Sequence, residues 1–237
     1  MKNIAPYRSL HPGTQPDYLH HPYASSVLRS PRKPLVSIPQ TLSELTGPNA
    51  DGGYSVVSSD LTRISGGEEA QGQRIVVSGR VLDENARPVR NALLEIWQAN
   101  AAGRYFHRLD QHNAPLDPNF TGVGQTLTDD NGNYRFITIL PGRYPWGNHY
   151  NAWRPAHIHF SLFGSSVATR LVTQMYFPGD PMLECDPIFN CVVDPIARRN
   201  LISTMDWETT IPNEAIGYRF DIILRGRDAT PMETNHR

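Results

Sequence analysis

The chain has 237 residues, 39% of them hydrophobic, and a formal net charge of −1, so it can form a sizeable core as one large β domain or two small ones. The nearly neutral charge argues against a nucleic acid or an anionic membrane as partner, since neither is drawn to a neutral protein. No apolar run approaches the ~20 residues of a membrane span, and the N-terminus shows no apolar signal core, so we expect a cytoplasmic protein.

Residues 1–70 are predicted to form an extended N-terminal arm. The first fifty residues hold eight of the 20 prolines. Proline removes a backbone donor and fixes φ, so neither a central strand nor a long helix can form there. The arm is nevertheless too rich in Tyr, Leu and Val for a disordered linker. We expect it to lie in a groove on its own core or on another subunit.

Residues 71–237 are predicted to form one all-β domain. Short runs of β-branched and aromatic residues alternate with turn signals, which is typical of an antiparallel β-sandwich with long loops. The expected strands are residues 75–83, 92–97, 134–139, 156–163, 168–177 and 218–224. The one plausible helix, Pro195 to Met205, is too short to build a layer. Cys185 and Cys191 are expected as reduced thiols, because their spacing suits no standard zinc site.

The strand at residues 156–163 carries His157 and His159. Side chains alternate faces along a strand, so both imidazoles project the same way and are pre-spaced to chelate a metal. A His-x-His pair alone is more often two polar strand residues that face water. The rest of the chain has to decide between the two interpretations.

Several segments resemble the prealbumin-like and carboxypeptidase-regulatory-like modules, which are β-sandwiches. The resemblance lies in Gly79-x-Val81-x-Asp83, in Thr128-Asp129-x-x-Gly132-x-Tyr134 and in Pro141-Gly142-x-Tyr144. In such binding modules the tyrosine after Pro-Gly only packs a corner, so Tyr144 alone would be structural. A non-catalytic binding module is therefore one alternative, and it predicts a colourless, metal-free protein.

Other segments of the chain have no counterpart in such a binding module. Gly103-Arg104-Tyr105 follows the strand end at Trp97-Gln98-Ala99-Asn100, and the run from Pro141 to Trp146 leads to the run from Arg154 to His159. Together these segments closely resemble the intradiol ring-cleaving dioxygenases, with a resemblance that covers about residues 75–225. It implies one non-haem Fe(III) per chain, held by Tyr105, Tyr144, His157 and His159.

The implied ligand set makes chemical sense. Phenolate is a hard anionic oxygen donor that favours ferric over ferrous iron, and imidazole suits iron generally. Fe³⁺ with two tyrosinates and one hydroxide sums to zero charge, which a partly buried pocket tolerates. Two rival metal sites fit less well. An Fe(II) facial triad needs a carboxylate beside its two histidines, and a cupin needs a glutamate a few residues beyond His159, where Phe160–Gly164 stands.

The resemblance also implies roles for other residues. Tyr144 is the ligand that leaves when a catechol chelates the iron, and it accepts a catechol proton, whereas Tyr105 stays. Arg154 stabilises charge on the substrate ring, with Gln174 touching the same ring; its alternative is an ordinary ion pair. Strand alternation places Arg154 on the side opposite His157 or in the preceding turn. The remaining implied substrate contacts are Tyr23, Trp146 and Ile188.

The Pro-rich arm and the segments Leu116–Phe120 and Tyr218–Ile222 resemble more particularly the iron-bearing beta chains of the family members that cleave protocatechuate. This resemblance implies cleavage of 3,4-dihydroxybenzoate by O₂ to 3-carboxy-cis,cis-muconate. It also implies an alpha chain of similar fold, without the iron ligands, as partner. Catechol and hydroxyquinol are the alternative substrates. Relatives that act on them have a helical N-terminal region, which the proline density of residues 1–50 excludes here.

Overall fold

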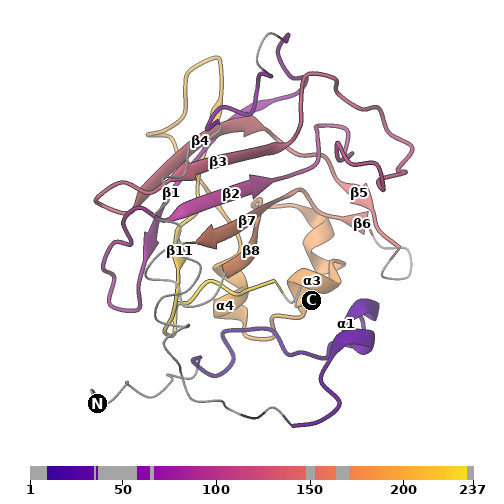
Figure 1. Ribbon diagram of the computed structural model, residues 1–237, viewed down its shortest axis with the longest axis vertical. Helices are drawn as coiled ribbons and strands as arrows, with labels where there is room; N and C mark the ends of the chain where they lie inside the picture. Colours follow the sequence, from indigo (N-terminus) through magenta and orange to yellow (C-terminus); the bar gives the residue numbers. More distant parts are fainter. Residues whose placement is uncertain are drawn as a thin grey trace.

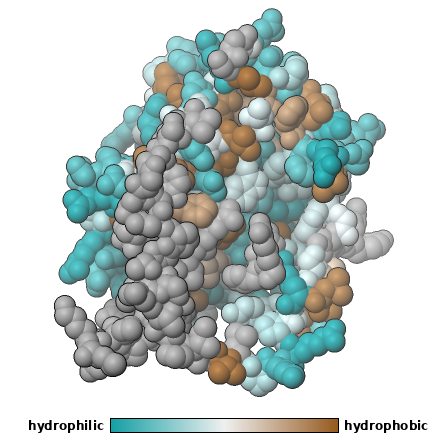
Figure 2. All heavy atoms as spheres, viewed as in Figure 1, coloured by the Kyte–Doolittle hydropathy of each residue, from teal (hydrophilic) through white to brown (hydrophobic). Residues whose placement is uncertain are grey.

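The computed structural model describes residues 10–34, 36, 58–64, 67–147, 153–163 and 171–233. Two packed β-sheets form most of this part, with short helices grouped at one end (Figure 1). The predicted all-β sandwich is confirmed. Figure 2 shows hydrophilic side chains around this face, with apolar residues in separate patches. Within the described ranges, no helix is long and apolar enough to cross a membrane.

The first sheet is built around β1 (Arg74–Leu82). It pairs antiparallel with β4 (Asn133–Ile139) but parallel with both β10 (Ile216–Arg219) and β11 (Ile222–Ile223). The two parallel pairings are the exception to the predicted antiparallel arrangement. They join segments far apart in the chain, so no local sequence pattern could show their direction. A short strand, β9 (Thr204–Met205), extends this sheet by pairing with β10.

The second sheet has the order β3 (Val123–Leu127), β2 (Leu93–Trp97), β7 (His157–Phe163) and β8 (Leu171–Tyr176), and every pair in it is antiparallel. The sequence analysis missed β3, whose Val-Gly-Gln-Thr-Leu sequence includes a glycine that weakens the strand signal. The hydrophobic core fills the space between the two sheets.

Strand β7 is covered on both faces. On one face, Ile158, Phe160 and Leu162 are at most 1% exposed and belong to the core between the sheets. The alternation of a strand places His157 and His159 on the other face, where they are only 2% and 8% exposed. The interpretation of this pair as polar residues facing water is therefore wrong.

Three short helices follow β8, and each begins at an Asp-Pro pair. They are η1 (Pro181–Glu184), α3 (Pro187–Asn190) and α4 (Pro195–Arg199). In each, the aspartate accepts a hydrogen bond from a first-turn backbone N–H, and proline occupies the first turn, where its missing N–H costs nothing. The predicted helix over 195–205 is too long, because residues 204–205 pair as β9 instead. Both cysteines are free thiols, as expected.

The described part of the N-terminal arm, residues 10–34, contains a six-residue helix, α1 (Ala24–Arg29). In Figure 1 this indigo segment runs below the yellow C-terminal segment. Residues 58–64 already lie on the sandwich, where Leu61 N–H donates to the carbonyl of Ile137 (2.8 Å). Residues 37–57 lie outside the described ranges. The division at residues 70 and 71, and a partner-wrapping role for the arm, stay predictions.

Candidate metal centre

The two histidines of β7 present the same ring nitrogen to the site. Nδ1 of His157 lies 2.7 Å from the carbonyl oxygen of Pro155, so Nδ1–H donates there and Nε2 remains an acceptor. Nδ1 of His159 lies 3.2 Å from Oε2 of Glu233, which fixes the same tautomer. The two ring centroids are 4.9 Å apart. Both Nε2 atoms therefore present their lone pair on the same side of the strand.

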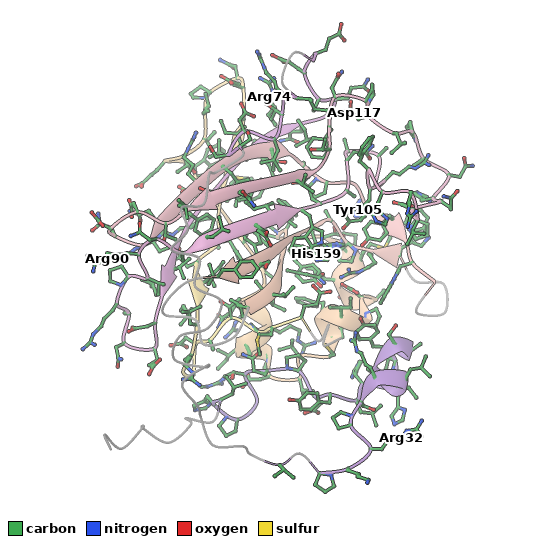
Figure 3. The ribbon with its side chains drawn as sticks, viewed as in Figure 1. Arg32, Arg74, Arg90, Tyr105, Asp117 and His159 are labelled. Atoms are coloured by element: carbon green, nitrogen blue, oxygen red, sulfur yellow. The ribbon has the colours of Figure 1, made fainter. Side chains whose placement is uncertain are left out.

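A phenol meets each of these nitrogens. The hydroxyl of Tyr144 lies 3.2 Å from Nε2 of His157, and the hydroxyl of Tyr105 lies 3.2 Å from Nε2 of His159. The two phenol rings meet edge to face, with centroids 5.5 Å apart. Figure 3 shows Tyr105 and His159 beside one another, the first on a loop and the second on β7. The structure thus brings together the four side chains that the sequence predicted as metal ligands.

The two tyrosines come from segments that touch each other. Tyr105 lies in the loop after β2, and its backbone N–H donates to Oδ2 of Asp110 (2.8 Å). Tyr144 lies in β5 (Tyr144–Pro145), which pairs with β6 (Trp153–Arg154) in a sheet of two strands. Gly103 joins the two segments: its φ is +80°, and a Cβ there would lie 2.1 Å from the carbonyl oxygen of Arg143. Only glycine suits that close approach.

Without a cation, the surroundings of Tyr105 and of His157 favour the neutral form of each side chain. Burial of the phenol raises the pKa of Tyr105 well above its ordinary value, and the adjacent Tyr144 phenol raises it further, although part of the Tyr105 ring stays accessible. Burial lowers the pKa of His157 well below its ordinary value, and the positive charge of Arg154 adds to the effect. A trivalent cation would reverse the balance for the phenol of Tyr105, because its charge favours phenolate.

The donor set decides which metal fits. Among the described residues no group of three or more His, Cys, Asp or Glu side chains could hold a metal. The side-chain oxygens that lie beside the two imidazoles are those of the phenols. Two phenolates with two imidazoles form a hard, anionic set that suits ferric iron. The residues present thus fit a non-haem iron.

Arg154 lies against the imidazole of His157 rather than away from it. Its guanidinium lies 3.1 Å from Nε2 of His157 and is only 3% exposed. The prediction placed it on the opposite side or in the preceding turn. Both alternatives are wrong, because Arg154 lies in β6 and because Pro155 and Ala156 interrupt the strand between β6 and β7 and break the alternation. Its alternative role as an ion-pair partner is also present, since Nη2 lies 2.9 Å from Oδ2 of the buried Asp186.

Gln174 belongs to the same network. Its Oε1 accepts from Nη2 of Arg154 (2.6 Å) and from the hydroxyl of Tyr176 (2.9 Å). That hydroxyl also lies 3.0 Å from Oδ2 of Asp186. The sequence analysis missed both Tyr176 and Asp186. Tyr176 could have been found, since it lies two residues after Gln174 on the same face of β8. Asp186 is the N-cap of α3, and no sequence pattern links that position to Gln174.

A pocket of about 530 Å³ opens beside the two phenols. This volume suits a small organic ligand. Its aromatic lining includes Trp97, Tyr105, Tyr144 and Trp146.

The three predicted substrate-contacting residues, Trp146, Tyr23 and Ile188, are connected to the site by different interactions. The guanidinium of Arg154 lies 5.4 Å from the centroid of the Trp146 ring. The ring of Tyr23, from the arm, packs against Trp146 with centroids 5.4 Å apart. Ile188 is buried and connects through Asp186, to which its backbone N–H donates (3.2 Å). Trp146 therefore contacts both Arg154 and Tyr23, whereas Ile188 is linked to Arg154 through their shared partner Asp186.

Comparison with known proteins defines the class. Residues 45–226 match the sequence model of a family described as Dioxygenase. The chain belongs to this family, that of the intradiol ring-cleaving dioxygenases, which are oxidoreductases that use non-haem iron. A solved structure with the same fold, 3-chlorocatechol 1,2-dioxygenase from Rhodococcus opacus 1CP, is 25% identical with a TM-score of 0.53. That match covers 69% of this chain and 63% of that one.

Three further similarities point to a particular branch of the family. Residues 7–41 match a model described as the N-terminal part of the protocatechuate 3,4-dioxygenase beta subunit. The chain is 56% identical to the protocatechuate 3,4-dioxygenase beta chain of Burkholderia cepacia, over 93% of this chain and 94% of that protein. It is 29% identical to the alpha chain of protocatechuate 3,4-dioxygenase from Pseudomonas putida, over 83% and 97% respectively.

Proposed function

We propose that this chain is the iron-bearing subunit of a protocatechuate 3,4-dioxygenase. The complex cleaves protocatechuate with O₂ to 3-carboxy-cis,cis-muconate, and both oxygen atoms enter the product. The observation that carries the proposal is the convergence of Tyr105, Tyr144, His157 and His159 beside an aromatic pocket. The 56% identity to a beta chain supports both the substrate and a partner alpha chain of similar fold.

In the proposed holoenzyme those four residues hold one Fe(III) per chain. When bound, the ferric ion acts as a Lewis acid that draws charge from a catecholate and makes its ring susceptible to O₂. The two Nε2 atoms are fixed in the required tautomer by Pro155 and Glu233. The two phenols supply the negative charge that stabilises the ferric state.

Tyr144 is the proposed acceptor of a catechol proton. Its hydroxyl lies at the site, and its strand β5 pairs with the two-residue strand β6. A phenolate oxygen there takes one of the two catechol protons within hydrogen-bond reach, so that proton needs no separate base. Tyr105 is the tyrosine that stays in place, since its N–H is anchored to Asp110.

Arg154 is the proposed stabiliser of charge on the substrate ring, with Gln174 beside it. A guanidinium is planar and permanently charged, so it stabilises negative charge without any proton transfer. The buried contacts with Asp186 and Gln174 hold it in one orientation. Trp146, Ile188 and Tyr23 are the proposed apolar contacts that surround the ring and exclude water.

The test is oxygen uptake by the chain co-expressed with its alpha chain. We expect a coloured complex, because tyrosinate-to-iron charge transfer absorbs visible light, and oxygen uptake faster with protocatechuate than with catechol. Tyr105→Phe should remove much of the colour and the activity. Tyr218→Phe, on β10 of the other sheet, is the matched control and should change neither. A colourless, iron-free complex would overturn the proposal and favour the non-catalytic binding module.

Substrate preference separates the remaining alternatives. Faster uptake with catechol or hydroxyquinol would leave the iron site intact but overturn the proposed substrate. Expression of the chain alone tests the partner, since a fully active single chain would contradict dependence on an alpha chain. Fractionation of the source cells tests the expected cytoplasmic location.

A further inference from the structure

The two histidines of the site are held by different kinds of partner. His157 donates to the carbonyl of Pro155, two residues away on the same segment. His159 instead meets the carboxylate of Glu233, which lies 74 residues further along the chain. Glu233 is only 6% exposed, so its carboxylate is removed from most of the solvent. Burial of a carboxylate is unfavourable unless the carboxylate is paired, so the contact between Glu233 and His159 needs an explanation.

The C-terminal segment delivers Glu233 by pairing with the edge of β8. The backbone N–H of Glu233 donates to the carbonyl of Val172 (2.7 Å). The hydroxyl of Thr173 donates to the carbonyl of Pro231 (2.7 Å). These bonds fix the backbone on either side of Met232. The side chain of Glu233 therefore reaches His159 from an anchored position.

Gln15, from the N-terminal arm, forms hydrogen bonds with the backbone of the same C-terminal segment. Its Oε1 accepts from the backbone N–H of Met232 (2.7 Å), and its Nε2 donates to the carbonyl of Thr230 (3.4 Å). Figure 1 shows the yellow C-terminal segment running between the indigo arm and β8. The arm, the C-terminal segment and the sheet thus form one hydrogen-bonded series that ends at an imidazole of the site.

The imidazole of His159 is constrained on its face as well as on its edge. Trp97 stacks on it with a centroid distance of 4.8 Å and an interplanar angle of 6°. Stacking fixes the plane of the ring, while the carboxylate fixes which edge points toward the site. Together they direct Nε2 at the hydroxyl of Tyr105. A ligand held in both ways loses little freedom when it binds a metal.

We propose that Glu233 is a positioning residue for the metal centre, acting through Nδ1 of His159, and that Gln15 holds the C-terminal segment in the place this requires. The inference rests on the proposed function, since it takes His159 as a ligand. A carboxylate that accepts from Nδ1–H fixes the tautomer and makes Nε2 a stronger donor. Loss of such a partner typically weakens metal binding or activity by about 10- to 100-fold.

The test compares variants of Glu233 in the full complex with the alpha chain. Glu233→Met keeps the size but removes the acceptor, and Glu233→Gln keeps an acceptor but removes the charge. The readouts are the rate of iron loss to a chelator and the position of the visible absorption band. We expect Glu233→Met to lose iron about 10- to 100-fold faster. Glu233→Gln should show a smaller change and a shifted band.

Controls separate positioning from general stability. Glu184→Ala, at an exposed site in η1, should leave iron loss and band unchanged. Gln15→Ala should speed iron loss by a smaller factor than Glu233→Met, whereas Gln111→Ala, at an exposed loop position, should not. Iron loss from Glu233→Met at the wild-type rate, with an unshifted band, would overturn the inference. If that variant does not fold, wild-type behaviour of Glu233→Gln in both readouts would do so.

The wild-type complex separates this inference from the proposed function. A wild-type complex that neither binds iron nor cleaves protocatechuate would contradict the proposed function itself. A wild-type complex that does both, with Glu233 variants that behave identically, would contradict only the role of Glu233.

Discussion

The histidines and the tyrosines of the site stand on different kinds of support. His157 and His159 lie on β7, a strand hydrogen-bonded on both sides within a four-stranded sheet. Tyr105 lies on a loop, and Tyr144 on a strand of two residues. Sheet geometry therefore positions His157 and His159, which we call the strand wall of the site. Turns and close loop contacts position Tyr105 and Tyr144, which we call the loop wall.

This difference separates two requirements of the chemistry. A strand fixes the spacing of two side chains to within small fluctuations, because sliding it would break many hydrogen bonds at once. Loops open at lower free energy and are where moving elements are found. In the proposed mechanism the site keeps its iron while Tyr144 moves away, and such a site benefits from both kinds of support. The strand wall should therefore govern metal retention, and the loop wall should govern turnover.

The largest effect is expected when the strand wall is broken. His157→Ala removes a proposed iron ligand, so we expect the complex to lose iron more than about 100-fold faster than wild type, since loss of a residue that only supports a ligand already costs about 10- to 100-fold. The measurement is iron per complex after dialysis against a chelator. His112→Ala, an imidazole outside the four-residue cluster, is the control and should retain its iron. Retention of iron by His157→Ala would place the metal elsewhere.

The next effect concerns the loop wall. Tyr144→Phe should keep its iron while lowering kcat, because it removes the proposed proton acceptor but leaves the other three proposed ligands. Tyr105→Phe should lower both iron content and kcat. Both changes are followed by iron analysis beside steady-state oxygen uptake. The contrast between a departing and a permanent tyrosine would be lost if the two variants behaved alike.

A smaller effect is expected from the contact that joins the two tyrosine-bearing segments. Gly179→Ala meets no atom within 4 Å of the new Cβ, so it should cost only the ~1–2 kcal/mol of a positive φ. Gly103→Ala has a similar φ but also overlaps the Arg143 carbonyl, which adds about 1–3 kcal/mol of overpacking. Thermal unfolding measures both. Equal destabilisation would show that the two loops can separate freely.

Much of the fold could be predicted because the relevant signals are local. The alternation in β1 and β4 and the Pro-rich arm were readable from short stretches of sequence. The parallel pairing of β1 with β10 and β11 was not, because partner and direction depend on a connection that spans the chain. The helices α1, η1 and α3 were missed because each contains too few residues to show a helical period.

The site shows the same division. His157 and His159 share a face by local geometry, and the two tyrosines followed from a family resemblance. Their partners were less accessible to sequence reasoning. Glu233 reaches His159 across 74 residues, and no spacing rule relates the two positions. Arg154 was placed on the wrong side because a proline after it ends the strand on which the alternation argument depended.

The smallest expected effect tests whether Asp110 positions Tyr105 for function or only contributes to the stability of the loop. Asp110 accepts hydrogen bonds from the backbone N–H groups of Tyr105 and His112 (2.8 and 2.9 Å). Asp206, in a turn beside β9, likewise accepts two, from the N–H of Glu208 and the hydroxyl of Thr209 (both 3.0 Å). Replacing either aspartate by alanine should cost about 1 kcal/mol of unfolding free energy.

The two variants should differ in function despite this similar cost. Asp110→Ala frees the backbone of Tyr105, so KM for protocatechuate should rise and the visible band should broaden as the phenolate samples more positions. Asp206→Ala should change neither, because its turn carries no proposed ligand. Steady-state kinetics and absorption spectra of the two complexes make the comparison. Equal kinetics in both would mean that sheet geometry alone holds the site, and that the loop needs no anchor of its own.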